Sequence, residues 1–490
     1  MLGMYLKNEI FLKALIVLST LEVVSLLAYT VPEVNSVLLP VFTFIILFIF
    51  WRYPAWLVYL PLLEIVWGSL GRIFYWELFG FSLSIRMLIF GLSICVWLLK
   101  RPNFQQLPWS NILFRLYLLT LLIIVWGMAQ GLMHGYNPSI IFADANGYFY
   151  LGYVLIWLTA TFRLSWPLII STTVAAATIV SLKTLFIFHI FTHAYSWANI
   201  GFLYLWIRDT KVGELTLVTA NYWRIFFQSQ IYPSMFWLAT TVYLIFKPTA
   251  VISQKIFWLM VLFFSSIILS LSRSFWLALA VTICLTVIIA VIFIWKQPRK
   301  MKRLWLIFGS CLSTLAVIVI FLFVPPVDTD LAAALANRLG RGEAAVTSRA
   351  NLLPVMVDGI KKNWLTGAGL GAELTYRNTD PRVRDQAGVN SLYTTHAFEF
   401  GWLDFWFKFG IVGFLAWVAL IGSLVLRLLK IARFKAQERP LIVAAAALVV
   451  FIAITHGVTP YLNHPLGLGL IALVITSLLM YEQSTAKSHH

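Results

Sequence analysis

The stretch from Arg273 to Arg303 reads RSFWLALAVTICLTVIIAVIFIWKQPRKMKR, and it carries two signals that decide the fold. Its apolar part, Phe275 to Trp295, contains no charged residue and is long enough, as a helix, to cross the roughly 30 Å hydrocarbon core of a bilayer. The segment that follows is rich in Lys and Arg, as cytoplasmic loops of membrane proteins are. The stretch therefore predicts a membrane-spanning helix that ends in a cytoplasmic loop.

The composition extends this interpretation to the whole chain. The 490 residues are 61% hydrophobic and 11% charged, and the mean hydropathy is +0.88, whereas soluble domains average about 25% charged residues. The first apolar segment, beginning near Phe11, continues too far for a signal peptide and lacks a small-residue cleavage site, so we expect it to be the first span. The pattern predicts a polytopic membrane protein, not a soluble enzyme with an anchor.

The net charge of +17 needs a separate explanation. We find no nucleic-acid-binding motif, and Lys and Arg are expected to collect in cytoplasmic loops. Some of the excess can meet anionic lipid headgroups or a pyrophosphate substrate. The three cysteines, Cys95, Cys284 and Cys311, lie inside apolar segments and have neither disulfide nor metal-ligand spacing.

We predict an all-α polytopic membrane protein with about 12–14 transmembrane helices. Both termini are expected in the cytoplasm, because WKQPRKMKR (295–303) and RLLKIARFKAQER (427–439) are the most basic loops. The expected helices cover residues 10–30, 36–51, 55–70, 82–99, 110–131, 145–161, 165–189, 225–246, 256–271, 273–295, 303–324, 398–428, 440–458 and 464–482.

Two long segments are then expected outside the cytoplasm. The larger lies between about 325 and 397 and contains 7 of the 19 acidic residues, and a persistent loop of roughly seventy residues is usually functional. The predicted regions are N-terminal transmembrane helices (1–190), a transmembrane core with an external loop at 191–223 (191–324), the large extracytoplasmic loop (325–397) and C-terminal transmembrane helices (398–490).

The larger loop contains one predicted amphipathic helix, at 351–364. Its apolar residues recur at helical spacing and can form one packing face: Leu352, Leu353, Met356, Ile360 and Trp364. Pro354 is tolerated best in the first turn, so we expect the helix to begin near Asn351. Arg349 precedes it, and TGAGLG (366–371) follows; such a turn can present N–H groups to a phosphate, although a purely structural turn is the simpler interpretation.

Arginines in the external segments are candidate anion ligands. Arg273 is expected at an external turn between two spans, where a side chain reaching to the interface is the structural alternative. Arg224 is expected at the start of the eighth span and has no carboxylate close to it in the sequence. Arg208 is a weaker candidate, because Asp209 beside it favours a local ion pair.

The segment HAFEFGWLDFWFKFGIVGF (396–414) contains candidate bases. His396 and Glu399 are three residues apart, so on a helix they would share a face, and a carboxylate can orient an imidazole. A polar helix cap among interfacial aromatics is the alternative. Asp404 is expected inside the next span, where Lys408 one turn later can pair with it. His456 and His464, beside the last external turn, are expected at most to line a cavity.

We find no zinc spacing, Walker loop or acidic metal dyad in the external loops, so no metal or other cofactor is expected. An arginine-based site suits a diphosphate leaving group, because guanidinium groups match phosphate oxygens in a fork geometry.

These motifs resemble the bacterial O-antigen ligase/polymerase superfamily. The resemblance runs from about Arg224 to Phe414 and rests on SLSRSFWLALA, SRANLLPVMVDGIKKNWLTGAGLG and the His396 segment. One departure concerns the histidine: the position usual for it before Gly410 holds Glu399, and His396 lies one helical turn earlier, followed by Ala397. The departure favours a repeat-unit polymerase over a ligase that uses lipid A-core.

The resemblance implies a GT-C-like architecture in the bacterial inner membrane and a metal-independent, inverting glycosyl transfer on the periplasmic side. The implied donor is a glycan on undecaprenyl diphosphate, held by Arg224, Arg273 and Arg349, and His396 or Glu399 would activate the acceptor hydroxyl. The acceptor would be a lipid-linked repeat unit in a polymerase, or lipid A-core or another surface acceptor in a ligase. Membrane lipids and a chain-length regulator or other polysaccharide-assembly proteins are implied partners, and O-antigen or exopolysaccharide is the implied product.

Three other functions stay open. A peptidoglycan-type polymerase would need a catalytic external aspartate, for which Asp358 and Asp385 are available. A transporter or flippase for lipid-linked sugars would need charges at membrane depth, for which Glu64 and Lys183 are the nearest candidates. A purely structural membrane protein would leave the polar loop and its arginines unexplained.

Overall fold

The computed structural model describes residues 6–78, 81–160, 164–219, 221–247, 253–294, 304–324, 344–377 and 392–487. The basic loop at 295–303 and Asp385, both used in the sequence interpretation, lie outside these ranges. The chain divides into two compact units. Unit 1 contains Met1–Leu107, Leu155–Ala334 and Ile431–Leu448, and unit 2 contains Pro108–Val154, Leu335–Lys430 and Val449–His490.

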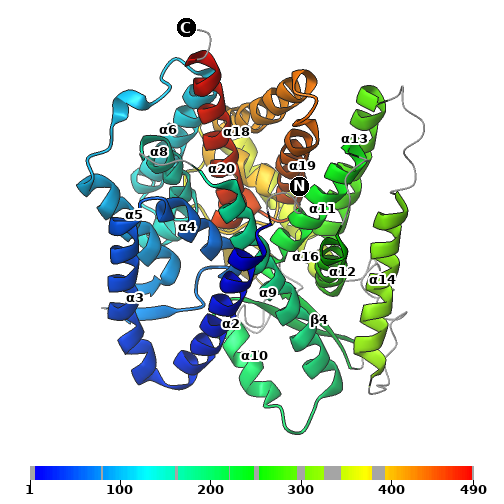
Figure 1. Ribbon diagram of the computed structural model, residues 1–490. Coiled ribbons are helices and arrows are strands. Elements are labelled where there is room, and N and C mark those ends of the chain that lie inside the picture. Colours follow the sequence, from blue (N-terminus) through cyan, green and yellow to red (C-terminus); the bar gives the residue numbers. More distant parts are fainter. Residues whose placement is uncertain are drawn as a thin grey trace. The chain divides into compact units, whose positions relative to one another are not determined.

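The predicted all-α membrane fold is confirmed (Figure 1). Across the described ranges, nine helices are long and apolar enough to cross a membrane, or ten if one bent pair counts as a span. These nine are α2 (Asn8–Thr30), α3 (Pro32–Arg52), α6 (Ile112–Met133), α9 (Trp166–His193), α13 (Arg273–Ile294), α14 (Leu304–Phe323), α18 (Gly401–Phe434), α19 (Arg439–His456) and α20 (Pro465–Lys487).

Shorter helices fill the remaining predicted positions. They are α4 (Trp56–Trp67), α5 (Ile85–Leu99), α11 (Ile231–Phe246) and α12 (Gln254–Leu269). The single helix expected at 145–161 is instead a broken pair: α7 (Pro138–Ala145) meets the run of η2 (Tyr148–Gly152) and α8 (Tyr153–Thr159) at a bend of 50°. At this break, Gly147 packs so closely against the backbone of Asn463 that a Cβ would clash with it.

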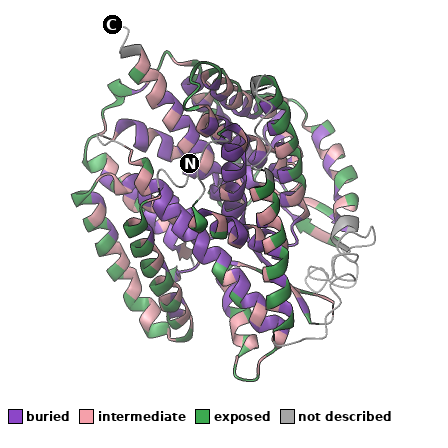
Figure 2. Cartoon of the chain, turned by 45° about the vertical axis from the view of Figure 1, so that its right-hand side comes forward, coloured by how far each residue is buried: buried purple, intermediate pink, exposed green. Residues whose placement is uncertain are grey.

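Unit 1 is built around α9, which contacts α2, α4, α12 and the strand β4 (Tyr222–Phe227). Most residues of α9 are buried, and many are small, including Ala175, Ala176 and Ala177, which lets neighbouring helices approach closely. Figure 2 distinguishes helices that are buried over much of their length from helices with long exposed stretches. α2 and α3 have few buried residues, as expected for helices whose apolar side chains face lipid.

Three short antiparallel hairpins accompany the helices, and the sequence interpretation did not predict them. They pair β1 (Tyr75–Leu78) with β2 (Phe81–Ser84), β3 (Gly213–Thr219) with β4, and β5 (Leu374–Arg377) with β6 (Leu392–Thr395). The β3–β4 hairpin corrects the expectation that a helix begins at 225, since α11 begins only at Ile231. Strands of this length give little periodic signal beside apolar helices.

The amphipathic helix of the large loop is α16 (Ala344–Lys362), which begins earlier than predicted, so that Pro354 lies inside it. A proline there leaves the carbonyl of Ala350 without its helical partner, at a cost of about 3 kcal/mol. Burial of Leu352, Met356 and Ile360 offsets that cost. Leu353 and Trp364, predicted for the same face, are 39% and 55% exposed.

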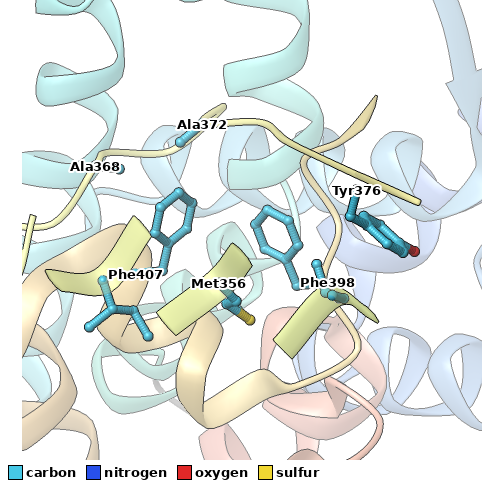
Figure 3. Packing of buried hydrophobic residues seen from close by; sticks show 8 residues of the cluster. Met356, Ala368, Ala372, Tyr376, Phe398 and Phe407 are labelled. Carbon is cyan, nitrogen blue, oxygen red and sulfur yellow. The ribbon is translucent and has the colours of Figure 1, made fainter. Parts of the chain in front are cut away.

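The buried face of α16 belongs to a small core within unit 2. Met356 packs with Phe398 and Phe407, and the chain carrying Ala368 and Ala372 passes over them (Figure 3). This core fixes α16 against the segments that precede and begin α18.

Candidate functional site

Arg224 lies on β4, and its side chain is largely buried. Its Nε donates to the carbonyl of Ser270 at 2.9 Å, and its Nη1 lies 3.6 Å from Oε2 of Glu214 on β3. Its guanidinium also stacks over the Phe226 ring at 4.6 Å from the centroid. No carboxylate is close to Arg224 in the sequence, but the β3–β4 hairpin brings Glu214 beside it in space.

The bond to Ser270 places Arg224 beside the turn that carries Arg273. This turn joins α12 to α13, and Leu271 adopts a left-handed φ of 46° in it. Ser272 and Ser274 bond to each other at 3.0 Å, and Arg273, partly exposed, is the first residue of α13. The structure therefore brings two of the three predicted diphosphate ligands, Arg224 and Arg273, to one region of unit 1.

Arg208 ends α10 (Ile200–Asp209) and forms the local ion pair that the sequence suggested. Its Nε lies 2.8 Å from Oδ1 of Asp209, whose other oxygen accepts from the hydroxyl of Tyr29 at 2.7 Å. The hydrogen bond from Arg208 lowers the pKa of the Asp209 carboxyl. These contacts support a structural role for Arg208.

In unit 2, the side chains of Arg349 and Glu399 form an ion pair through the Nε of Arg349. The two groups are partly exposed, at 29% and 49% of their side chains. A predicted diphosphate ligand and a candidate base are thus direct partners, although 50 positions separate them.

His396 lies near Glu399 in the chain but does not share a helical face with it. The segment from His396 to Phe400 is not helical, and α18 begins at Gly401, so the expected helical relationship was wrong. Within this irregular segment, the side chain of Phe398 is buried in the core beside Phe407. The carbonyl of His396 accepts a hydrogen bond of 2.8 Å from Nζ of Lys408.

Lys408 is the centre of a buried charge cluster. Its Nζ lies 2.6 Å from Oδ1 of Asp144 and 3.0 Å from Oδ1 of Asp404, and the Lys408 and Asp404 side chains have no exposed surface. The predicted pair of Asp404 and Lys408 is confirmed, whereas Asp144 was not predicted. Asn463 donates to the second oxygen of Asp404. Because the ammonium also holds the His396 carbonyl, the cluster ties the candidate base to α18.

The helix α18 is broken at Gly410, whose φ is 68°. The glycine turn 366–371 packs against this break. The break leaves the carbonyls of Phe407 and Lys408 without their helical donors, and the N–H groups of Ala368 and Gly369 bond to them at 2.7 and 3.0 Å.

Three further N–H groups of the turn also have protein acceptors. Gly367 donates to the carbonyl of Asn363 at 2.9 Å, Leu370 to that of Gly127 at 2.8 Å, and Gly371 to Oδ2 of Asp144 at 2.9 Å. These bonds favour the structural interpretation of the turn over a phosphate-binding loop.

The contacts of the last two candidates, His456 and His464, favour structural roles. His456 ends α19, is fully buried against the Phe405 ring at 4.6 Å, and accepts from the N–H of Leu462 at 3.2 Å. His464 precedes α20, and its Nδ1 accepts from the N–H of Leu466 at 3.4 Å. Both contacts stabilise the turn between α19 and α20.

The charges named for the transporter alternative are paired within unit 1. Glu64 bonds Arg86 at 2.7 Å, and Lys183 bonds Glu22 at 2.6 Å, with all four side chains largely buried. Within the described segments, no three or more His, Cys, Asp or Glu residues are grouped so that they could hold a metal ion.

This architecture defines a polytopic α-helical membrane protein with a polar segment folded over the start of one span. Residues 258–418, about a third of the 490-residue chain, match the sequence model of the family described as O-antigen ligase. The match supports the O-antigen ligase/polymerase superfamily, so the resemblance drawn from the motifs is confirmed. A comparison with curated proteins gives no match to this chain. The match favours a glycan-processing enzyme of the ligase or polymerase type.

Proposed function

We propose that this protein is a membrane glycosyltransferase that polymerises glycan repeat units carried on undecaprenyl diphosphate. The observation that carries the proposal is the match at 258–418, because it includes Arg273, Arg349, His396 and Glu399. The basic loops favour an active side facing the periplasm of a bacterial inner membrane. Lipid-linked substrate, membrane lipids and polysaccharide-assembly proteins such as a chain-length regulator are the proposed partners.

The reaction is an inverting substitution at the anomeric carbon of the donor glycan. The acceptor hydroxyl oxygen attacks this carbon, the bond from the carbon to the diphosphate oxygen breaks, and undecaprenyl diphosphate leaves. The proton of the hydroxyl passes to a base on the protein. The leaving diphosphate gains negative charge, which arginines can stabilise.

Arg224 and Arg273 are the proposed diphosphate ligands in unit 1. Arg224 is held by the Ser270 carbonyl and by Glu214, so its guanidinium is oriented before substrate binds. An oriented cation stabilises developing charge without a further cost of reorganisation.

In unit 2, the ion pair favours one division of roles between the candidate bases. Glu399 bonds Arg349, so its carboxylate orients a cation, and we assign it a positioning role. The backbone of His396 is anchored by Lys408, and its imidazole is the proposed base. Arg349 is the third proposed diphosphate ligand.

The second candidate function is an O-antigen ligase, which the description of the matched family favours. It shares the donor and chemistry and differs in the acceptor, which would be lipid A-core or another surface molecule.

Reconstitution tests these functions. We would supply undecaprenyl-diphosphate repeat units from the native host to proteoliposomes and look for a ladder of longer lipid-linked glycans. A ladder that is lost in Arg273→Ala supports the polymerase. Glycan transferred only to added lipid A-core would mean a ligase. Lipid-linked units that cross the bilayer without any transfer would mean a transporter and would overturn the proposal.

A further inference from the structure

Three aromatic rings stack in series at the C-terminal end of α9, in unit 1. The ring of His193 lies parallel to that of Tyr195 within 6°, and Tyr195 lies within 22° of Trp197, each pair with centroids 5.4 Å apart. Ala194 adopts a left-handed φ of 46° at the helix end and turns the chain here. His193 and Tyr195 are partly buried, and Trp197 is 71% exposed. We call His193, Tyr195 and Trp197 the aromatic ladder.

The ladder is held by hydrogen bonds of its polar atoms. The carbonyl of Phe321 can only accept, so Nδ1 of His189, 3.1 Å away, is the donor. In the neutral imidazole, Nε2 of His189 then accepts from the hydroxyl of Tyr195 at 2.9 Å. His193 bonds the carbonyl of His189 at 2.8 Å. The Tyr195 ring is thus fixed in place, and the stack presents the broad indole of Trp197 at the surface.

A fixed, exposed aromatic face is a suitable surface for a sugar ring. The face of an aromatic ring carries partial negative charge, and the C–H groups on one face of a pyranose carry partial positive charge. Stacking leaves the sugar hydroxyl groups at the edge, in water. The rings lose little conformational entropy on binding, because the ladder is already ordered.

The ladder begins at the end of α9, a helix that also contacts β4, the strand that carries Arg224. Phe191, on the last turn of α9, packs edge-on against Trp223 at 5.1 Å, and Trp223 is adjacent to Arg224 on β4. A lipid-linked glycan whose diphosphate is bound at Arg224 would extend its sugars from this neighbourhood.

We propose that the aromatic ladder is a glycan-binding platform that stacks a sugar ring of the repeat unit on Trp197. The inference rests on the proposed function and adds a binding site for the part of the substrate beyond the diphosphate. The competing explanation is that Trp197 is an interfacial tryptophan that only anchors the protein in lipid.

The test compares Trp197→Ala and Trp197→Phe with wild type and a matched control. Trp305→Ala is the control, because Trp305 on α14 is also 71% exposed and is outside the ladder. Each protein would be assayed in proteoliposomes with the native lipid-linked repeat unit and with a donor that carries one sugar. Elution on size exclusion and the melting temperature would report folding, which removal of an exposed side chain should leave unchanged.

We expect Trp197→Ala to raise the KM for the full repeat unit about fivefold, with kcat and the KM for the one-sugar donor nearly unchanged, as for loss of one stacked ring. Trp197→Phe should retain most of the affinity, and Trp305→Ala should match wild type. An unchanged KM in Trp197→Ala, or an equal rise in Trp197→Ala and Trp305→Ala, would overturn the platform.

Binding of the free repeat-unit oligosaccharide, measured by saturation-transfer NMR, separates the two proposals. If wild type forms no product but binds the oligosaccharide, and Trp197→Ala does not bind it, the platform stands and the glycosyltransferase proposal fails. If wild type forms product and both proteins bind the oligosaccharide equally, only the platform fails.

Discussion

Arg349 and Glu399 form an ion pair that joins α16 to the segment before α18. Both residues lie in the region matched by the O-antigen ligase family, and each was a candidate for a different chemical task. A carboxylate that orients an arginine cannot be replaced by an amide without loosening that arginine, whereas a carboxylate that removes a proton cannot be replaced at all. The pair therefore makes the assignment of the base testable.

We predict that His396→Ala loses activity by about 10²-fold or more, as for the loss of a general base. Glu399→Gln should lose only about tenfold, because an amide oxygen still accepts from Arg349, although without charge assistance. The initial rate of ladder formation in proteoliposomes measures both. A Glu399→Gln protein as inactive as His396→Ala, with Arg349→Lys still active, would instead identify Glu399 as the base.

The Lys408 cluster predicts a large effect on stability. Lys408→Met removes the one ammonium that neutralises Asp144 and Asp404, and a buried charge left without its partner costs about 3–5 kcal/mol. We expect a clear fall in the melting temperature in detergent. Lys408→Met/Asp404→Asn should recover part of the loss, because one buried negative charge is removed together with the positive one. Equal melting temperatures for Lys408→Met and wild type would contradict the importance of the cluster.

The glycine turn predicts a second stability effect that is independent of charge. Gly367 has a φ of 81°, and a Cβ there would meet the Lys408 carbonyl and the Gly410 nitrogen. Gly367→Ala should therefore lower the melting temperature, since the left-handed backbone alone costs about 1–2 kcal/mol for a residue with a Cβ. Gly422→Ala is the control: Gly422 lies within α18, and a Cβ there meets nothing within 4 Å. It should be neutral or stabilising by about 0.5–1 kcal/mol.

Local patterns in the sequence predicted the spans and the pair of Asp404 with Lys408, because both depend on residues within one helix. Asp144 was not predictable, since it reaches Lys408 across 264 positions of sequence. The partnership of Arg349 and Glu399 was hidden for the same reason. The start of α16 was predicted too late, near Asn351, because Pro354 was expected only in a first turn. The burial of Leu352, Met356 and Ile360 outweighs the local penalty of the proline inside the helix. The β3–β4 hairpin was missed because strands of this length give little periodic signal beside apolar helices.

The environment of Arg224 gives the last prediction. Arg224→Lys keeps the positive charge but loses the planar fork that bonds the Ser270 carbonyl and faces Glu214, so the cation is no longer oriented. We expect at least a tenfold loss of kcat/KM for the lipid-linked donor, as a loss of roughly 1.4 kcal/mol of transition-state stabilisation implies. Arg208→Ala removes an exposed pair with Asp209 and should change the rate less than about twofold. If Arg224→Lys retained full activity while Arg208→Ala lost it, the proposed diphosphate site of unit 1 would have to be reassigned to α10.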